Sequence, residues 1–533
     1  MNQVLKMSHD DAIRKACEEI ACLMNKDFDE KSLMKIINSV CEKYQLKSLP
    51  SKSMILSFLK DDRLRKNLKV KPIRTASGIA VIAVMSKPYP CPHGACVYCP
   101  GGYKFSTPQS YTGHEPAALR AIQNDFDAFK QVSTRINQLR AICHDVDKAE
   151  IIIMGGTFLS LPIDYQKDFI KGCYDALNMS YSKDIEDAKR IAENSNIRNV
   201  GMTIETRPDF CKEEHVDLML SYGVTRVEIG VQALDDKIYQ LVKRGHTVKD
   251  VIDAFRIAKD SSLKIVAHMM PGLPGSNPDR DFDDFNRLFN DPDFKPDMLK
   301  IYPTLLIESS ELYNWYLDGR YQPYDDNTTI ELLARVKEIV PRWIRIMRIQ
   351  RDIPARLIVA GVKKSNLREL VQKELLKKGK RCNCIRCREV GLKELKYGIK
   401  VKPENIKLMK QVYEASNGVE VFLSYEDIVN DALIGFLRLR YPSEKAHRKE
   451  IDSRTCLVRE LHVYGTMVPI GKRYDDCYQH KGFGINLMRE AERVAREEFD
   501  SRKIVVMSAI GTREYYRRLG YEIEGPYMAK RLD

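Results

Sequence analysis

Three cysteines stand close together in the segment CPHGACVYC, which runs from Cys91 through Cys96 to Cys99. Three thiolates in one loop can bind three irons of a [4Fe–4S] cluster and leave the fourth iron open. An open iron can chelate the amino and carboxylate groups of S-adenosylmethionine (SAM), whose one-electron cleavage gives a 5′-deoxyadenosyl radical. A structural zinc site is the alternative, but it needs four closed ligands and would have to recruit His93. We therefore predict the cluster.

A second group of thiols, Cys382, Cys384 and Cys387, stands between Arg381 and Arg388. Three thiolates so close together indicate a structural zinc site, although no fourth ligand is evident. A second redox cluster is the alternative. The flanking arginines could present charge to RNA, or the zinc could simply join two domains.

The composition indicates a soluble, cytoplasmic protein. The chain has 533 residues, 44% of them hydrophobic, and 14 cysteines. Its beginning, MNQVLKMSHDDAIRKA, lacks the apolar stretch of a secretory signal, and no window approaches the ~20 apolar residues of a membrane helix. We therefore expect the clustered cysteines to bind metal rather than to form disulfides.

Short apolar runs alternate with helical patterns from about residue 79 to residue 349. Such alternation predicts parallel strands with right-handed crossovers, and six or seven units favour a partial or full α/β barrel. Helices are predicted at Ala117–Arg140, Tyr165–Leu177, Glu213–Tyr222 and Val248–Ser261. The expected strands are Ile79–Met85, Glu150–Met154, Val200–Glu205, Arg226–Val231, Lys264–Met269, Met298–Tyr302 and Trp343–Ile349.

Polar and small residues follow the carboxyl ends of these strands, where such barrels place their chemistry. Gly155 and Gly156 could let the SAM amino group approach the backbone, or could simply form a turn. Glu205 and Arg207 could bind SAM or pair with each other, and Gln232 could contact the same ligand. Lys300 lies within a strand, where a buried ammonium needs an anion, so we predict a catalytic ligand contact for it.

From about residue 418 the pattern changes to a meander, with strands expected at Val419–Ser424, Leu433–Tyr441 and Cys456–Tyr464. A glycine-containing loop, Gln479 to Gly484, precedes a helix predicted over Phe483–Phe499. Backbone N–H groups of such a loop and the helix N-terminus suit a pyrophosphate. A strand over Lys503–Ser508, a short helix over Thr512–Leu519 and a last strand should follow. The loop is similar to the Q/R-x-x-G-x-G/A loop of the GNAT acetyltransferases, which bind acetyl-CoA.

Basic residues are concentrated in two tracts of a chain with a formal net charge of +13. Ten basic residues stand against two acids from Lys43 to Arg74, and fifteen against three from Arg342 to Arg388. The two tracts could meet one phosphate backbone, or could be solvated helix faces.

Several motifs in order resemble the catalytic subunit of Elongator, from about residue 70 to the C-terminus and more loosely before it. The spacing of Cys91 and Cys96 departs by one residue from the usual C-x3-C-x2-C pattern and agrees with that family. The other motifs are QSYTG at 109–113, MGGTF at 154–158, IETRP at 204–208, GVQ at 230–232 and HMMPGLPG at 268–275. The resemblance implies a tRNA uridine carboxymethyltransferase.

The same resemblance implies which residues contact acetyl-CoA. Tyr516 would lie near the thioester, although Tyr515 could exchange roles with it, and Lys148 would add a contact. The other implied contacts are Glu460, Leu461, His462, Val463, Gln479, Gly482, Phe483, Gly484 and Ile485.

We therefore expect an α/β protein with a radical-SAM partial TIM-like barrel that makes 5-carboxymethyluridine at the wobble position of tRNA from acetyl-CoA. The expected partners are the tRNA anticodon loop, acetyl-CoA and Elongator-like subunits or a second copy. The expected domains are a helical, basic, tRNA-binding region (1–75), the barrel (76–350), a basic zinc-binding linker (351–417) and a GNAT domain (418–533).

Three rival hypotheses remain. The chain could be a lysine acetyltransferase, acting for example on histones, with a barrel that only holds structure. It could be a tRNA-binding scaffold with degenerate sites, or a radical-SAM enzyme that uses acetyl-CoA on a small molecule.

Overall fold

A computed structural model describes residues 8–24, 29–59, 61, 64–65, 68, 70–71, 74–465 and 482–532. Its contacts divide the chain into two compact units. One unit comprises Met1–Thr75 with Ser133–Val146, and the other comprises Ala76–Val132 with Asp147–Asp533. Among the described residues no helix is both long and apolar enough to span a bilayer.

The smaller unit begins with three helices, α1 (His9–Leu23), α2 (Glu30–Lys43) and α3 (Lys52–Leu56), as the helical spacing predicts. Each helix starts at a side-chain cap, because Ser8, Asp29 and Ser51 accept hydrogen bonds from backbone N–H groups of the first turn. The apolar faces form one core, which includes Ala16, Ile20, Leu33, Ile37, Val40 and Leu56.

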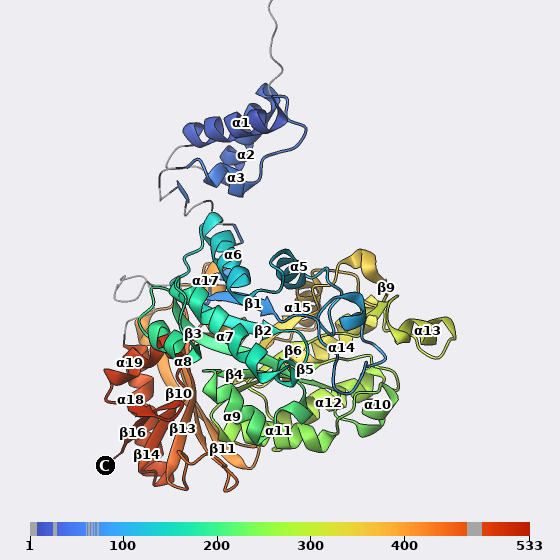
Figure 1. Ribbon diagram of the computed structural model, residues 1–533. Coiled ribbons are helices and arrows are strands. Elements are labelled where there is room, and N and C mark those ends of the chain that lie inside the picture. Colours follow the sequence, from blue (N-terminus) through green and yellow to red (C-terminus); the bar gives the residue numbers. More distant parts are fainter. Residues whose placement is uncertain are drawn as a thin grey trace, which may run out of the picture. The chain divides into compact units, whose positions relative to one another are not determined.

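Seven parallel strands form an open half-barrel in the larger unit (Figure 1). Every strand predicted for the barrel is present, and β1 and β8 are the two free edges of the sheet. In spatial order the strands are β1 (Ala80–Met85), β2 (Lys148–Met154), β3 (Arg198–Thr206), β4 (Arg226–Gln232), β5 (Lys264–Met269), β6 (Met298–Ile301) and β8 (Arg345–Ile349).

Helices connect successive strands, and one predicted helix proves to be two. The segment predicted at Ala117–Arg140 forms α5 (Pro116–Gln123) and α6 (Ala128–Ala141). Asp125 and Phe126 between them have φ of 52° and 57°, which ends the first helix. The other barrel helices are α7 (Ile163–Asn178), α8 (Ile185–Ala192), α9 (Glu213–Ser221), α10 (Asp236–Leu241), α11 (Val248–Asp260), α12 (Pro278–Asn290), α13 (Glu311–Leu317) and α14 (Asp326–Ile339).

The segment after β8 carries a short strand and three helices. The strand β9 (Ile358–Ala360) pairs with β7 (Leu306–Ile307) in a separate two-stranded sheet. The helices are α15 (Leu367–Lys377), α16 (Ile385–Arg388) and α17 (Val390–Tyr397).

A second seven-stranded sheet follows, drawn in orange and red in Figure 1. It begins at Ile406, earlier than the change of pattern near residue 418 indicates, and the expected last strand is a hairpin of two strands. The helix α18 (Phe483–Phe499) packs on this sheet, and α19 (Arg513–Arg517) follows β14. In spatial order the strands are β10 (Ile406–Ala415), β11 (Gly418–Asp427), β12 (Ala432–Tyr441), β13 (Thr455–Val463), β14 (Lys503–Val506), β16 (Tyr527–Arg531) and β15 (Glu522–Glu524).

Buried arginines join the second sheet to the amino ends of the barrel strands. Arg459 of β13 pairs with Asp297, which precedes β6, and Arg440 of β12 contacts Asp260 at 2.7 Å, at the end of α11. Burial alone would raise the pKa of Asp297, but Arg459 and Arg438 outweigh it and hold that pKa below its ordinary value. Removing one partner of such a buried pair costs about 3–5 kcal/mol, so these pairs fix the sheet to the barrel.

Candidate active site

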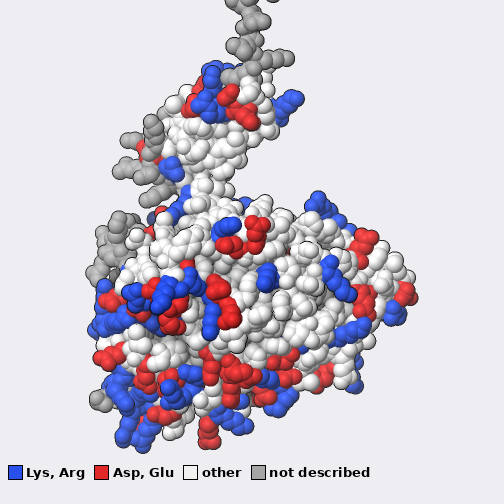
Figure 2. Space-filling view, in the orientation of Figure 1, with Lys and Arg blue, Asp and Glu red and all other residues white. Residues whose placement is uncertain are grey.

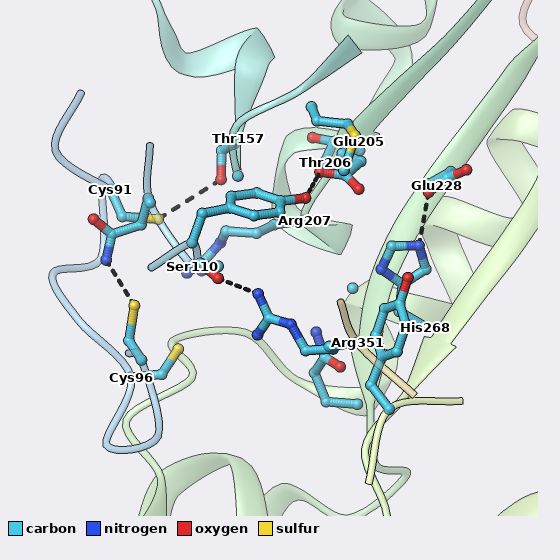
Figure 3. A pocket seen from close by; sticks show the side chains of 18 of the residues that line it. Cys91, Cys96, Ser110, Thr157, Glu205, Thr206, Arg207, Glu228, His268 and Arg351 are labelled. Carbon is cyan, nitrogen blue, oxygen red and sulfur yellow. Dashed lines mark hydrogen bonds and ion pairs between the residues drawn. The ribbon is translucent and has the colours of Figure 1, made fainter. Parts of the chain in front are cut away.

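The three cysteines of the first group line a pocket at the carboxyl ends of the barrel strands (Figure 3). Burial raises the pKa of the Cys91 and Cys99 thiols. The Gln109 amide donates to the Cys99 sulfur at 3.2 Å, and His93 Nε2 lies 3.2 Å from the Cys96 sulfur. These three sulfurs therefore share one wall of the pocket.

The chemistry of this part of the pocket fits a cluster with a bound ligand. In the described part of the chain, the mutually close thiols that one metal ion requires occur at Cys382, Cys384 and Cys387, not at the first group. A wider set of thiols suits a cluster, in which each thiolate binds a different iron. Residues that line this pocket also carry buried polar atoms without a hydrogen-bond partner among the described residues, namely His93 Nδ1, Arg207 Nη1, Glu228 Oε1 and Gln232 Oε1. Such atoms are expected where a polar ligand binds.

The glycines after β2 allow the cysteine loop and the next segment to pack against the strand. Gly155 has a φ of 130°, and a Cβ there would overlap the Ser86 hydroxyl. A Cβ at Gly156 would lie 3.2 Å from the Gln109 Cβ, and Gly156 itself lines the pocket. Both positions thus favour glycine, chiefly because φ of 130° and 91° are backbone conformations that other residues rarely adopt.

Glu205 and Arg207 both line the pocket, but they do not pair with each other. The Tyr111 hydroxyl donates to Glu205 at 2.8 Å. Arg207 instead forms two hydrogen bonds to Asp209, at 2.9 and 2.8 Å. Gln232 also lines the pocket and has a φ of 77°. The structure therefore brings together four of the residues that the sequence places at strand ends, with Gly156 as the fourth.

Lys300 finds its anion inside the protein, which removes the reason for expecting an external one. Its ammonium contacts the fully buried carboxylate of Glu228 on β4. Burial alone would raise the pKa of Glu228, but Lys300 and His268 outweigh it and hold that pKa below its ordinary value. His268 Nε2 lies 2.9 Å from the same carboxylate and lines the pocket.

The sequence interpretation missed Tyr111, Glu228, His268 and Arg351, all of which line the pocket. A signal for Glu228 was present, because side chains on a strand alternate and residues 228, 230 and 232 share one face. Arg351 donates to the Ser110 carbonyl and stacks over Tyr111, a contact between distant segments that no local pattern encodes.

The second cysteine group is compact and lies outside this pocket. The sulfurs of Cys382, Cys384 and Cys387 lie within 4.8 Å of one another, and no fourth His, Cys, Asp or Glu joins them among the described residues. Hydrogen bonds with the other two thiols lower the pKa of Cys384. Three thiols at this separation fit one metal ion.

The arginines around this group are not all available to RNA. Arg388 is 1% exposed and pairs with Glu426 at 2.8 Å. Arg345 and Arg342 also form ion pairs inside the protein, with Glu389 and Glu426. The expectation that Arg388 contacts RNA is therefore wrong, because its charge stabilises the join between α16 and the second sheet. The exposed basic residues of the tract are Arg348, Arg356, Lys363, Lys364, Lys373, Lys377, Lys378, Lys380 and Arg381.

The loop before α18 lies partly outside the described residues, as does Gln479. Gly482 precedes α18 with a φ of 90°, and Phe483 packs on Tyr425 with ring centroids 5.1 Å apart. A Cβ at Gly484 would lie 2.9 Å from the Tyr515 hydroxyl and within 4 Å of Leu461 and Val463. The exposed Ile485 follows in the first turn of the helix.

The two candidate tyrosines differ in burial. Tyr516 belongs to the core of the second sheet and is 6% exposed, whereas Tyr515 is 37% exposed. Tyr515 is also the tyrosine whose hydroxyl reaches the start of α18.

Two residues of β13 that are expected near acetyl-CoA form contacts inside the protein. Glu460 pairs with Arg438 at 2.8 Å, and His462 contacts the Ser77 carbonyl.

The two candidate sites occupy opposite ends of the barrel strands. His462 of β13 contacts Ser77, which precedes β1. Lys148 begins β2, and burial lowers the pKa of its ammonium. The strand β13 and the start of α18 therefore lie toward the amino ends, whereas the cysteine loop lies at the carboxyl ends. Charged side chains of the strands, including the Glu150–Arg226 and Glu228–Lys300 pairs, lie between the ends.

Comparison with known proteins agrees with this geometry. The profile of the radical SAM superfamily matches residues 87–288, that of the radical SAM C-terminal domain matches 296–377, and that of the ELP3 N-terminal domain matches 13–76. The half-barrel, its cysteine loop and these matches define a radical SAM protein.

The whole chain has similar relatives. It is 50% identical to the "tRNA uridine(34) acetyltransferase" of Methanocaldococcus infernus, over 95% of this chain and 96% of the relative. It is 46% identical to human "Elongator complex protein 3", over 99% and 98%. A solved structure of Methanocaldococcus infernus Elp3 with an N-terminal deletion superimposes with a TM-score of 0.77 at 49% identity, over 86% of this chain and 100% of that one. The chain belongs to the Elongator complex protein 3 family.

Proposed function

We propose that this protein modifies the wobble uridine of cytoplasmic tRNA to 5-carboxymethyluridine, with acetyl-CoA as the carbon source. The observation that supports this proposal most is the pocket at the carboxyl ends of the radical-SAM half-barrel. Three thiols line it together with polar groups that have no hydrogen-bond partner among the described residues. The names of the relatives point to uridine 34 of tRNA as the substrate.

Cys91, Cys96 and Cys99 would hold a [4Fe–4S] cluster, and SAM would fill the adjoining pocket. When bound, these groups supply a 5′-deoxyadenosyl radical. A radical is needed because the methyl C–H bonds of acetyl-CoA are too inert for acid–base chemistry. Glu205 and Gln232 would orient the SAM ribose and amino acid, and Arg207 would offer its unpartnered Nη1 to the carboxylate. Lys300 would act on the pocket through Glu228 rather than touch the ligand.

The start of α18 would bind acetyl-CoA. Gly482, Gly484 and the helix N-terminus would receive the pyrophosphate, with Gln479, Phe483 and Ile485 beside it. The backbone of Glu460 to Val463 would pair with the pantetheine arm. Tyr515, rather than the buried Tyr516, would meet the thioester, and Lys148 would contribute from the amino end of β2.

Transfer RNA would contact exposed basic side chains of α15 and the loop after it, such as Lys373 and Arg381. In Figure 2 acidic and basic side chains are intermixed over the C-terminal sheet and its helices, so that side gives a phosphate backbone little preference. The zinc held by Cys382, Cys384 and Cys387 would shape the basic segment. Other Elongator-like subunits or a second copy would complete the assembly.

Nucleoside mass spectrometry tests the proposal. Reduced enzyme with SAM, acetyl-CoA and unmodified tRNA should yield 5-carboxymethyluridine at the wobble position, and omission of any one component should abolish it. Unchanged uridine in the complete mixture would contradict the proposal.

A lysine acetyltransferase is the second candidate, because the start of α18 lies at the other end of the barrel from the cysteine loop. This function predicts acetylation of protein lysines at the wild-type rate after the triple change Cys91→Ala, Cys96→Ala and Cys99→Ala. Loss of all turnover in that variant would exclude it.

A further inference from the structure

A short turn directly after the cysteine loop presents two aromatic rings to solvent. The 3-10 turn η2 (Tyr103–Phe105) leaves Tyr103 58% exposed and Phe105 59% exposed. Lys104 between them is exposed and forms no ion pair with any described residue. Single exposed apolar side chains are ordinary, but two aromatic rings that bracket a lysine form a specific surface.

The turn is held rigidly from within. Thr107 is buried, and its hydroxyl accepts from the Gly102 N–H and donates to the Tyr111 carbonyl, both at 3.0 Å. Backbone bonds from Phe105 and Ser106 to Gly102 and Tyr103 close the turn. The rings are therefore displayed on a preformed support, which lowers the entropic cost of binding.

The turn also connects two segments that line the pocket of Cys91, Cys96 and Cys99. Cys99 precedes it, and Gln109, Ser110 and Tyr111 follow it. Cys99 donates to the Gly101 carbonyl at 3.0 Å, so the base of the turn touches a proposed cluster ligand. The turn is therefore joined on both sides to residues that line this pocket.

We propose that Tyr103, Lys104 and Phe105 form a stacking platform for unpaired bases of an RNA loop. This inference rests on the proposed function and adds the surface that receives the nucleotides next to the reacting base. A base must leave its stack to enter an active-site pocket, and its neighbours then expose their faces. Aromatic rings stack on such faces regardless of sequence, and the lysine between them suits the linking phosphate.

Binding of an anticodon stem-loop RNA with a wobble uridine, followed by fluorescence anisotropy on the full chain, tests the platform. Tyr103→Ala and Phe105→Ala should each weaken binding by about 5- to 150-fold. Phe105→Tyr should stay within about twofold of wild type, whereas Phe105→Leu, which is apolar but not aromatic, should behave like alanine. Lys104→Ala should lower the slope of log affinity against log salt by about 0.7–1, and the two ring variants should leave that slope unchanged.

A second readout reports stacking directly. A 2-aminopurine placed beside the wobble uridine should be quenched by wild-type protein and stay bright with Tyr103→Ala or Phe105→Ala. Tyr181→Ala is the matched control, because Tyr181 is 79% exposed but lies after α7, away from the cysteine loop in the sequence, and it should change neither readout.

The outcomes separate this inference from the proposed function. If wild-type protein binds the stem-loop but both ring variants bind equally well, the platform is wrong and the turn faces another partner, such as a protein. If wild-type protein binds no RNA and forms no modified uridine, the proposed function itself fails.

Discussion

At the scale of single residues, Glu228 and Lys300 form a buried ion pair in which each charge depends on the other for stability. Lys300→Met would leave the Glu228 carboxylate buried in the barrel without the ammonium that contacts it. We expect a loss of about 3–5 kcal/mol in the free energy of unfolding, measured by urea titration. The double variant Glu228→Gln and Lys300→Met should recover most of that loss. Equal stability of Lys300→Met and wild type would show that the pair is not formed.

The same pair marks the limit of prediction from sequence at this scale. The sequence identifies Lys300 as a buried ammonium that needs an anion, but its partner depends on the placement of β4 and β6 in the barrel. The ion pair of Arg388 cannot be predicted for the same reason, because Glu426 lies on a distant strand. The strand-end residues Glu205 and Gln232 were predictable, since a strand and its end can be read from local pattern.

At the scale of elements, the turn after β2 should tolerate no side chain at Gly155. Gly155→Ala adds backbone strain of about 1–3 kcal/mol at a φ of 130° and requires the Ser86 hydroxyl to move. We expect the cysteine loop to be displaced, so that anaerobic reconstitution gives far fewer than the about four irons per chain of wild type. Gly379→Ala, with a φ of 67° and open space around it, is the control for strain alone. Full iron content in Gly155→Ala would refute the argument.

The start of α18 offers a similar pair of glycines. Gly484→Val should collide with the Tyr515 hydroxyl and weaken acetyl-CoA binding at least about tenfold by calorimetry, without loss of iron. Gly482→Ala meets nothing within 4 Å and should cost only the strain of its φ of 90°. Undiminished acetyl-CoA affinity in Gly484→Val would place the ligand elsewhere.

Most elements could be predicted because apolar runs and turn residues are local signals. The barrel strands and α18 follow such patterns closely. The local pattern does not predict the strand β10. Its sequence IKLMKQVYEA lies at an exposed edge of the sheet and lacks a clear apolar face. The break between α5 and α6 does have a local signal, because Asn124, Asp125 and Asp127 are turn-forming residues, and Asp127 accepts from the Lys130 N–H at 2.8 Å at the start of α6.

At the scale of the whole molecule, some basic side chains are buried in ion pairs and others are exposed to solvent. Arg381 is exposed, whereas Arg388, in the same tract, is buried in an ion pair. Arg381→Glu should therefore weaken all tRNAs similarly and lower the salt slope by about one or more, with unchanged stability. Arg388→Ala should instead destabilise the fold by about 3–5 kcal/mol. A filter-binding salt series beside urea unfolding measures both, and the opposite assignment would contradict the structure.

The two candidate sites lie at opposite ends of one set of strands, and we propose that a single acetyl-CoA serves both. Acetyl-CoA deuterated in its methyl group, incubated with reduced enzyme, SAM and tRNA, tests this claim most directly by mass spectrometry of the products. If one acetyl-CoA serves both sites, deuterium should appear in 5′-deoxyadenosine and the two acetyl carbons on C5 of the wobble uridine. Deuterium that never reaches 5′-deoxyadenosine, together with acetylated lysines on added protein, would contradict the claim.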